Sequence, residues 1–148
     1  MEPEGKEMSG LKRIAVVGAG QMGSGIAQVS ALAGYDVLLN DVSEERIRSG
    51  LATINGNLAR AVAGGKMTED ERNAALGRIG AATTYEALAD ADLVIEAAVE
   101  NEKVKRDILG GISKVLKPEG MLATNTSSIS ITRLAAATDR PEKFIGIH

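Results

Sequence analysis

Three glycines follow directly on a short apolar segment near the start of the chain. Residues Ile14–Val17 are apolar, and Gly18, Gly20 and Gly23 come next with the spacing G-x-G-x-x-G. Where a strand turns into a helix, the first glycine permits a tight turn, the second lets the backbone approach a pyrophosphate, and the third allows close packing. Free N–H groups at the start of the helix then face the phosphates. The pattern predicts a dinucleotide site, and an ordinary glycine turn without a ligand is the alternative.

The residues after the glycines indicate a helix that leads to a second strand. Apolar side chains recur at helical spacing over residues 21–33, and Gly34 stands where a C-cap glycine belongs. This order of strand, glycine loop, helix and strand favours the dinucleotide interpretation. The expected apolar stripe consists of Met22, Ile26, Val29 and Ala33.

Asp41 ends the second predicted strand, roughly 20 residues after the last glycine of the motif. A carboxylate at this point accepts hydrogen bonds from the adenosine ribose hydroxyls and repels a 2′-phosphate, which predicts NAD rather than NADP. The alternative is that Asp41 caps the next helix, although Ser43 is able to do so alone.

Strands and helices alternate along the rest of the chain. Such alternation predicts an α/β fold with a Rossmann-type, doubly wound parallel sheet. Two further helices between the second and third strands, at about 43–78, predict an inserted helical pair with Thr68 and Glu71 as a capping box. We expect strands at about 12–17, 36–40, 80–83, 93–98, 121–124 and 144–147, and helices at about 21–33, 43–63, 68–78, 103–116 and 131–137.

The composition excludes several classes of function. The 148 residues suit one domain at 12–148 after a flexible tail at 1–11, and a net charge of −3 without basic blocks argues against nucleic-acid binding. No cysteine and a single histidine exclude a disulfide, a cysteine–zinc site and a multi-histidine metal site, so no metal is expected. No signal peptide or membrane-spanning run is evident, and we expect a cytoplasmic protein.

Several polar residues follow later strands, where ligands of open parallel sheets bind. Glu100 and Lys105 follow the fourth strand, Asn125–Ser127 the fifth, and His148 the sixth. His148 is the natural acid–base candidate, because imidazole titrates near neutral pH. Each also has a plainer interpretation: Ser127 as a cap, Asn125 as a loop residue, Glu100 and Lys105 as a solvated helix start.

Together these motifs resemble the NAD-binding domain of L-3-hydroxyacyl-CoA dehydrogenases, and in particular the bacterial 3-hydroxybutyryl-CoA dehydrogenases. The resemblance covers nearly all of the chain after the tail, in the family's order and spacing, and includes the inserted helical pair. It is carried by four segments, at residues 17–28, 94–101, 123–128 and 140–148.

The resemblance implies a role for each site residue. His148 would take the proton from the 3-hydroxyl of a 3-hydroxyacyl-CoA while hydride moves to NAD, with Ser127 beside the nicotinamide and the substrate hydroxyl. Lys66, at the tip of the helical pair, lies near where the family binds coenzyme A, although a lysine at a loop tip is usually only solvated. The implied cofactor-binding residues are Gly18, Ala19, Gly20, Gln21, Met22, Gly23, Asp41, Ala97, Glu100, Lys105, Asn125 and Ser127.

The family's pattern extends past the residue that His148 matches, to a glutamate that orients the imidazole and to a helical domain that supplies much of the acyl pocket and the main dimer contact. We expect the present chain to represent the cofactor-binding half without that C-terminal helical domain, and to turn over acyl-CoA poorly alone. We also expect exposed apolar surface, with either homo-oligomerisation or association with such a domain. The alternatives are a non-catalytic NAD-binding module and a 3-hydroxyisobutyrate- or 6-phosphogluconate-type dehydrogenase domain.

Overall fold

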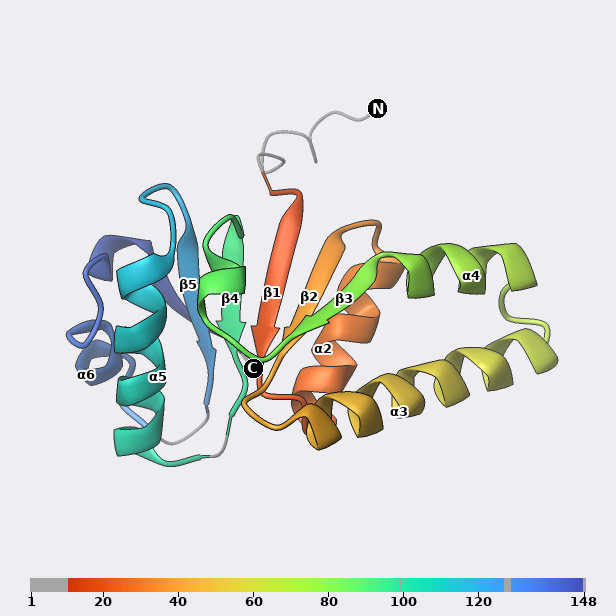
Figure 1. Cartoon of the computed structure of the whole chain (residues 1–148), viewed down its shortest axis with the longest axis horizontal. Coiled ribbons are helices and arrows are strands. Elements are labelled where there is room, and N and C mark those ends of the chain that lie inside the picture. Colours follow the sequence, from red (N-terminus) through yellow and green to blue (C-terminus); the bar gives the residue numbers. More distant parts are fainter. Residues whose placement is uncertain (1–10, 99, 127–128, 148) are drawn as a thin grey trace.

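Six parallel strands form one sheet in the computed structural model, which describes residues 11–98, 100–126 and 129–147 (Figure 1). Their order across the sheet is β3-β2-β1-β4-β5-β6. Strands β2 and β3 are added on one side of β1 and strands β4 to β6 on the other, so that the strand order reverses between β1 and β4. This is the doubly wound arrangement that the sequence predicts, and the fold class is confirmed. The strands are β1 (Arg13–Val17), β2 (Asp36–Asn40), β3 (Ile79–Ala82), β4 (Leu93–Glu96), β5 (Met121–Asn125) and β6 (Phe144–Ile147).

The helices lie close to the predicted positions. The inserted pair between β2 and β3 is present as α3 and α4, and the Thr68–Glu71 capping box opens the second of them. Two short 3-10 turns, η2 (Glu86–Leu88) and η3 (Pro141–Lys143), were not predicted, because three residues carry no periodicity. None of the helices in the described ranges is both long and apolar enough to cross a bilayer. The α-helices are α2 (Gln21–Leu32), α3 (Glu44–Ala63), α4 (Glu69–Gly77), α5 (Glu102–Val115) and α6 (Ile131–Ala135).

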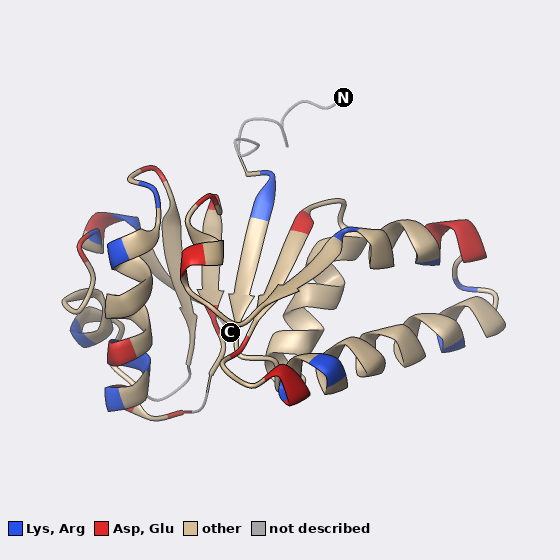
Figure 2. Cartoon of the chain, viewed as in Figure 1, with Lys and Arg blue, Asp and Glu red and all other residues tan. Residues whose placement is uncertain are grey.

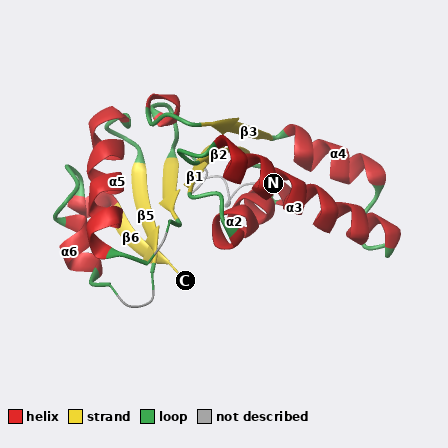
Figure 3. Cartoon of the chain, turned by 60° about the horizontal axis from the view of Figure 1, so that its bottom comes forward, coloured by secondary structure: helices red, strands yellow, loops and turns green. Residues whose placement is uncertain are grey.

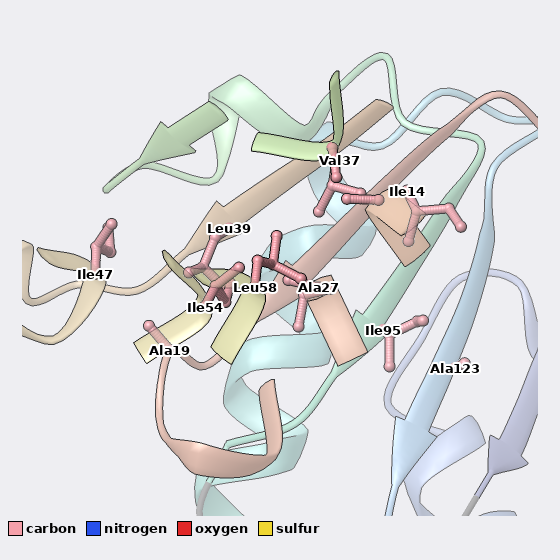
Figure 4. Close-up of a cluster of buried hydrophobic side chains, with 13 residues drawn as sticks. Ile14, Ala19, Ala27, Val37, Leu39, Ile47, Ile54, Leu58, Ile95 and Ala123 are labelled. Carbon is pink, nitrogen blue, oxygen red and sulfur yellow. The ribbon is translucent and has the colours of Figure 1, made fainter. Parts of the chain in front are cut away.

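Alternate residues of the strands feed two separate cores, one on each face of the sheet. On one face, Val16 and Leu39 pack with the side chains of α2, α3 and α4. On the other face, Val17 and Val94 pack with those of α5 and α6. Figure 3 shows α5 and α6 grouped apart from α2, α3 and α4, and Figure 4 shows the first core, in which Ile54 and Leu58 of α3 approach Leu39. Packing of helices on both faces thus fixes the positions of the strands, and with them the edge of the sheet formed by their carboxyl ends.

Most of the apolar stripe predicted for α2 does not face the core, and of its members only Ile26 packs against it. Met22 and Val29 are 57% and 66% exposed, whereas the buried side of the helix is lined by small residues. A Cβ on Gly23 would lie 1.7 Å from the carbonyl oxygen of Gly18, so the start of α2 approaches the glycine loop too closely for any side chain at this position. The buried residues of α2 are Gly23, Ser24, Ala27, Ser30 and Ala31.

The buried face of α5 is not the face on which its apolar residues recur. The sequence places Val104, Ile108, Ile112 and Val115 at helical spacing on one face of this helix, yet only Ile112 of them is buried. The helix is turned so that Lys105 points inward, and Val104 and Ile108 border a cleft instead. Periodicity missed this orientation because it assigns a lysine to solvent. The buried residues of α5 are Lys105, Leu109, Ile112 and Ser113.

Candidate dinucleotide-binding site

The loop between β1 and α2 is shaped by backbone contacts that only glycine permits. Gly18 has a φ of +111°, which L-residues with a Cβ rarely adopt, and its N–H donates a 2.7 Å hydrogen bond to the carbonyl of Asn40. A Cβ on Gly18 would lie 2.7 Å from the carbonyl oxygen of Ala97. The loop is therefore pressed between β2 on one side and the segment after β4 on the other.

The start of α2 opens toward this edge without a side chain to cover it. Gly20 is the N-cap residue, no side chain caps the helix, and its first turn contains no acidic residue. A Cβ on Gly20 would meet no atom within 4 Å, in contrast to one on Gly18 or Gly23. The N–H groups of this first turn are thus left for an anion, which the helix dipole also favours.

The Asp41 carboxylate contacts the glycine loop and is not the N-cap of α3. Its Oδ2 accepts a 2.9 Å hydrogen bond from the N–H of Ala19, and its Oδ1 accepts one of 3.0 Å from the N–H of Ser43. The cap is Ser43, whose hydroxyl accepts from the N–H of Arg46. An ionised carboxylate has about four lone-pair sites, so Asp41 retains acceptor capacity for a ligand hydroxyl.

A cleft of about 350 Å³ runs along the carboxyl ends of β1, β2 and β4. The predicted Gly18, Gly20, Asp41 and Ala97 all line it. Sequence reasoning missed other residues of its wall, because no motif identifies them. A signal for Arg46 is its place in the first turn of α3, just after Asp41. The missed residues are Val17, Asn40, Val42, Arg46, Tyr85, Ala98, Val104 and Ile108.

Tyr85 is the aromatic residue in this wall. Its ring lies against α5, where a Cβ on Gly111 would come within 2.9 Å of it. Burial raises the pKa of the Tyr85 phenol, and the negative charges of Asp41, Asp107 and Glu96 raise it further. The phenol therefore stays protonated and neutral at physiological pH, as a hydrogen-bond donor at the cleft.

A buried ion pair lies beneath the other half of the same edge. Lys105 of α5 and Glu96 of β4 are both 0% exposed, with Lys105 Nζ 2.9 Å and 2.7 Å from the two carboxylate oxygens. The alternative that Lys105 is no more than part of a solvated helix start is wrong, because its charge is paired within the protein. Its further role in cofactor binding stays a prediction.

Other predicted polar residues meet at this edge as well. The Thr126 hydroxyl, in the loop after β5, donates to the carboxylate of Glu100 in the loop after β4, and the Asn125 carbonyl accepts from Lys105. Sequence separation does not keep these groups apart, since parallel strands bring their carboxyl ends together. Ser127 and His148 lie outside the described residues. Lys66 is exposed between α3 and α4 and does not line the cleft, and Figure 1 shows that tip far from the glycine loop.

These features fit a bound dinucleotide. The backbone is too close for a side chain at Gly18 and Gly23 but open at Gly20, as approach of a pyrophosphate requires. A carboxylate stands at the end of β2, where a ribose would lie, and the cleft crosses the point where the strand order reverses.

The model of the family described as "3-hydroxyacyl-CoA dehydrogenase, NAD binding domain" matches residues 13–148. The chain belongs to this family. Its assignment agrees with the resemblance drawn from the sequence motifs, and NAD is the cofactor of the domain.

Individual relatives agree with the family. The chain is 64% identical over 138 residues to a 3-hydroxybutyryl-CoA dehydrogenase of Bradyrhizobium diazoefficiens, covering 93% of this chain and 47% of that protein. It is 43% identical to a 3-hydroxyadipyl-CoA dehydrogenase of Escherichia coli, covering 95% and 30%. The crystal structure of the (S)-3-hydroxybutyryl-CoA dehydrogenase of Ralstonia eutropha superposes with a TM-score of 0.91 at 43% identity, covering 93% and 49%. The chain thus spans about half the length, or less, of these relatives.

Proposed function

We propose that the chain is the cofactor-binding half of an enzyme that oxidises (S)-3-hydroxyacyl-CoA, of the 3-hydroxybutyryl-CoA kind, to 3-oxoacyl-CoA, or catalyses the reverse reaction. The observation that carries this proposal is the cleft at the glycine loop with Asp41 in its wall, in a chain 64% identical to a 3-hydroxybutyryl-CoA dehydrogenase. The relative with a 3-hydroxyadipyl-CoA name leaves the acyl chain length open.

In the proposed mechanism, the amides at the start of α2 and the loop at Gly18 and Gly20 hold the pyrophosphate, and Asp41 holds the adenosine ribose. NAD, when bound, supplies the hydride acceptor. Ala97, Glu100, Lys105 and Asn125 belong to the remainder of the proposed cofactor site, and the meeting of the loops after β4 and β5 supports this.

We propose His148 as the general base that takes the proton from the 3-hydroxyl, and Ser127 as the group that orients this hydroxyl. In the reverse direction, the imidazolium returns the proton to the alkoxide. Positioned proton transfer of this kind contributes about 10²- to 10⁴-fold to a rate. Lys66 remains a proposed contact for coenzyme A, and its distance from the cleft makes it the least supported of these residues.

We further propose that the exposed side of α2 is covered by the helical part of the longer relatives. Met22 and Val29 are exposed with Gly25 and Ile26 beside them in a shallow apolar groove, and Figure 2 shows no charged residue on α2. These exposed residues support the expectation of exposed apolar surface. Val29→Lys should weaken association with the second half of the Bradyrhizobium relative, supplied as a separate chain, and leave NADH affinity unchanged; equal association would contradict the proposal.

Turnover of acetoacetyl-CoA with NADH, measured with and without that second half, tests the function. We expect little turnover from the 148 residues alone and recovery on complementation. His148→Asn should lower the recovered rate by about 10²-fold or more and leave the Kd for NADH unchanged. NADH binding without turnover in either case would favour a non-catalytic NAD-binding module, and preferential turnover of 3-hydroxyisobutyrate or 6-phosphogluconate would favour a different dehydrogenase.

A further inference from the structure

Glu96 ends β4 and is wholly buried, although no cofactor contact is assigned to it. Its carboxylate accepts four hydrogen bonds. Oε1 accepts from the Thr124 hydroxyl at 2.6 Å, and Oε2 accepts from the N–H of Ala98 at 2.8 Å. The remaining two come from the ammonium of Lys105. The carboxylate therefore touches β5, α5 and the loop after its own strand at once.

Lys105 extends this network to the backbone of two loops. Besides Glu96, its Nζ donates to the carbonyl of Ala98 at 3.3 Å and to the carbonyl of Asn125 at 3.3 Å. Ala98 follows β4 and Asn125 ends β5, so a single ammonium joins the two neighbouring strand ends. Lys105 is 0% exposed and does not line the cleft, so in this structure its ammonium contacts only Glu96 and these two loops.

Stability alone is a poor reason for such a pair. Taking two charges out of water costs about as much as their attraction returns, and apolar residues of the same volume often serve equally well. The pair does, however, fix the geometry of the strand ends in a way that apolar packing does not. These ends lie in the half of the sheet opposite the Asp41 half, where the second nucleotide of a dinucleotide binds.

We propose that Glu96 is a positioning residue for the nicotinamide half of the site, acting through Lys105 and Thr124 to set the loops that carry Ala98 and Asn125. The proposal rests on the NAD-binding role of the domain. It separates the two halves of the ligand: the adenosine half depends on the glycine loop and Asp41, and the nicotinamide half depends on the buried network.

The test compares binding of NADH and ADP-ribose, which lacks the nicotinamide, by calorimetry. Thr124→Val keeps the shape of the side chain and the ion pair but removes the hydroxyl that donates to Glu96. We expect a Kd for NADH raised about three- to tenfold, a changed emission of bound NADH, and a Kd for ADP-ribose within twofold of that of the unaltered chain. The double variant Glu96→Gln with Lys105→Met should show a larger split of at least tenfold.

A matched control lies at the other end of the same strand. Asp92 and Lys117 form a partly buried pair with a 2.7 Å contact, and Asp92→Asn with Lys117→Met should alter neither affinity. Unchanged binding of both ligands by Thr124→Val, or equal weakening of both, overturns the proposal; if the double variant does not fold, this single variant decides. A loss of NADH affinity confined to Lys105→Met would instead show direct contact of the lysine with the ligand. Absence of NADH binding by the unaltered chain would contradict the NAD-binding assignment itself.

Discussion

The two halves of the sheet edge are built by different means. Under β1–β3, the backbone itself makes the site: Gly18 and Gly23 fit only without a Cβ, and Asp41 binds the N–H of Ala19 in the loop. At the carboxyl ends of β4–β6, buried side chains fix the edge instead, because Glu96 and Lys105 join strand ends that are distant in sequence. A short motif records the first kind of construction, whereas the second kind is distributed over residues that no local pattern connects.

This contrast implies different responses to substitution. In the glycine half, an added methyl group acts by steric overlap, so its effect depends on the few tenths of an ångström available. In the network half, loss of one charge leaves the other buried and unpaired, which is among the most costly single changes in a protein.

The largest effect is expected in the network half. Glu96→Gln leaves the ammonium of Lys105 without its counter-charge at 0% exposure, and should lower the free energy of unfolding by about 3–5 kcal/mol. Urea unfolding followed by circular dichroism measures this. The double variant that also carries Lys105→Met should recover much of the loss, and a double variant as unstable as the single one would contradict an ion-pair account.

Substitution by alanine should affect stability at Gly23 and NADH binding at Gly20. Gly23→Ala places a Cβ 1.7 Å from the carbonyl oxygen of Gly18, so we expect a loss of about 3 kcal/mol in unfolding free energy. Gly20→Ala meets nothing within 4 Å and should change stability by less than about 0.5 kcal/mol, yet weaken NADH tenfold or more, because the methyl group occupies the space of the ligand. Thermal unfolding and NADH titration of both variants separate the two effects; similar behaviour of the pair would disprove the assignment of Gly20.

Asp41 tests cofactor choice. Asp41→Ala should weaken NADH about tenfold, since it removes the proposed ribose acceptor and the hydrogen bonds to Ala19 and Ser43, and it should reduce discrimination against NADPH. The Kd values for both nucleotides measure this. Ser43→Ala serves as the control, because it removes only the cap of α3. A preference for NADPH in the unaltered chain would refute the ribose role.

A smaller effect concerns the amino end of the strands, where Asp92 joins the two halves. Burial acts to raise the pKa of Asp92, but hydrogen bonds from Lys117 and from the N–H groups of Arg13 and Lys12 prevail and lower the pKa from 3.8 to about 2. Because the folded pKa is the lower one, the stabilisation is fully present above about pH 4 and disappears as the pH falls toward 2. After allowance for solvent screening, we expect roughly 1 kcal/mol.

Urea unfolding between pH 5 and pH 2.5 measures this contribution. The free energy of unfolding should fall less steeply with decreasing pH in Asp92→Asn, because its side chain does not take up a proton in this range. An unchanged slope would show that other carboxylates account for the acid response.

The contrast between the glycine half and the buried network half also explains which features the sequence could predict and which it could not. The doubly wound parallel sheet, the inserted helices and the residues of the glycine loop follow from periodicity and from a motif whose glycines act locally. Periodicity identified the apolar stripe that includes Met22 and Val29, but it could not predict that these two side chains are exposed while small residues form the buried side of α2. The inward position of Lys105 was missed because its partner, Glu96, is identified only once β4 and α5 are packed together.

The most direct test of the account is calorimetric titration of the folded chain with NADH, ADP-ribose and NADPH under one set of conditions. We predict one saturable site for NADH, retained affinity for ADP-ribose, and binding of NADPH weaker by at least tenfold. A well-folded chain that shows no saturable heat with NADH, or that binds NADPH as tightly, would contradict the assignment of the glycine cleft and Asp41.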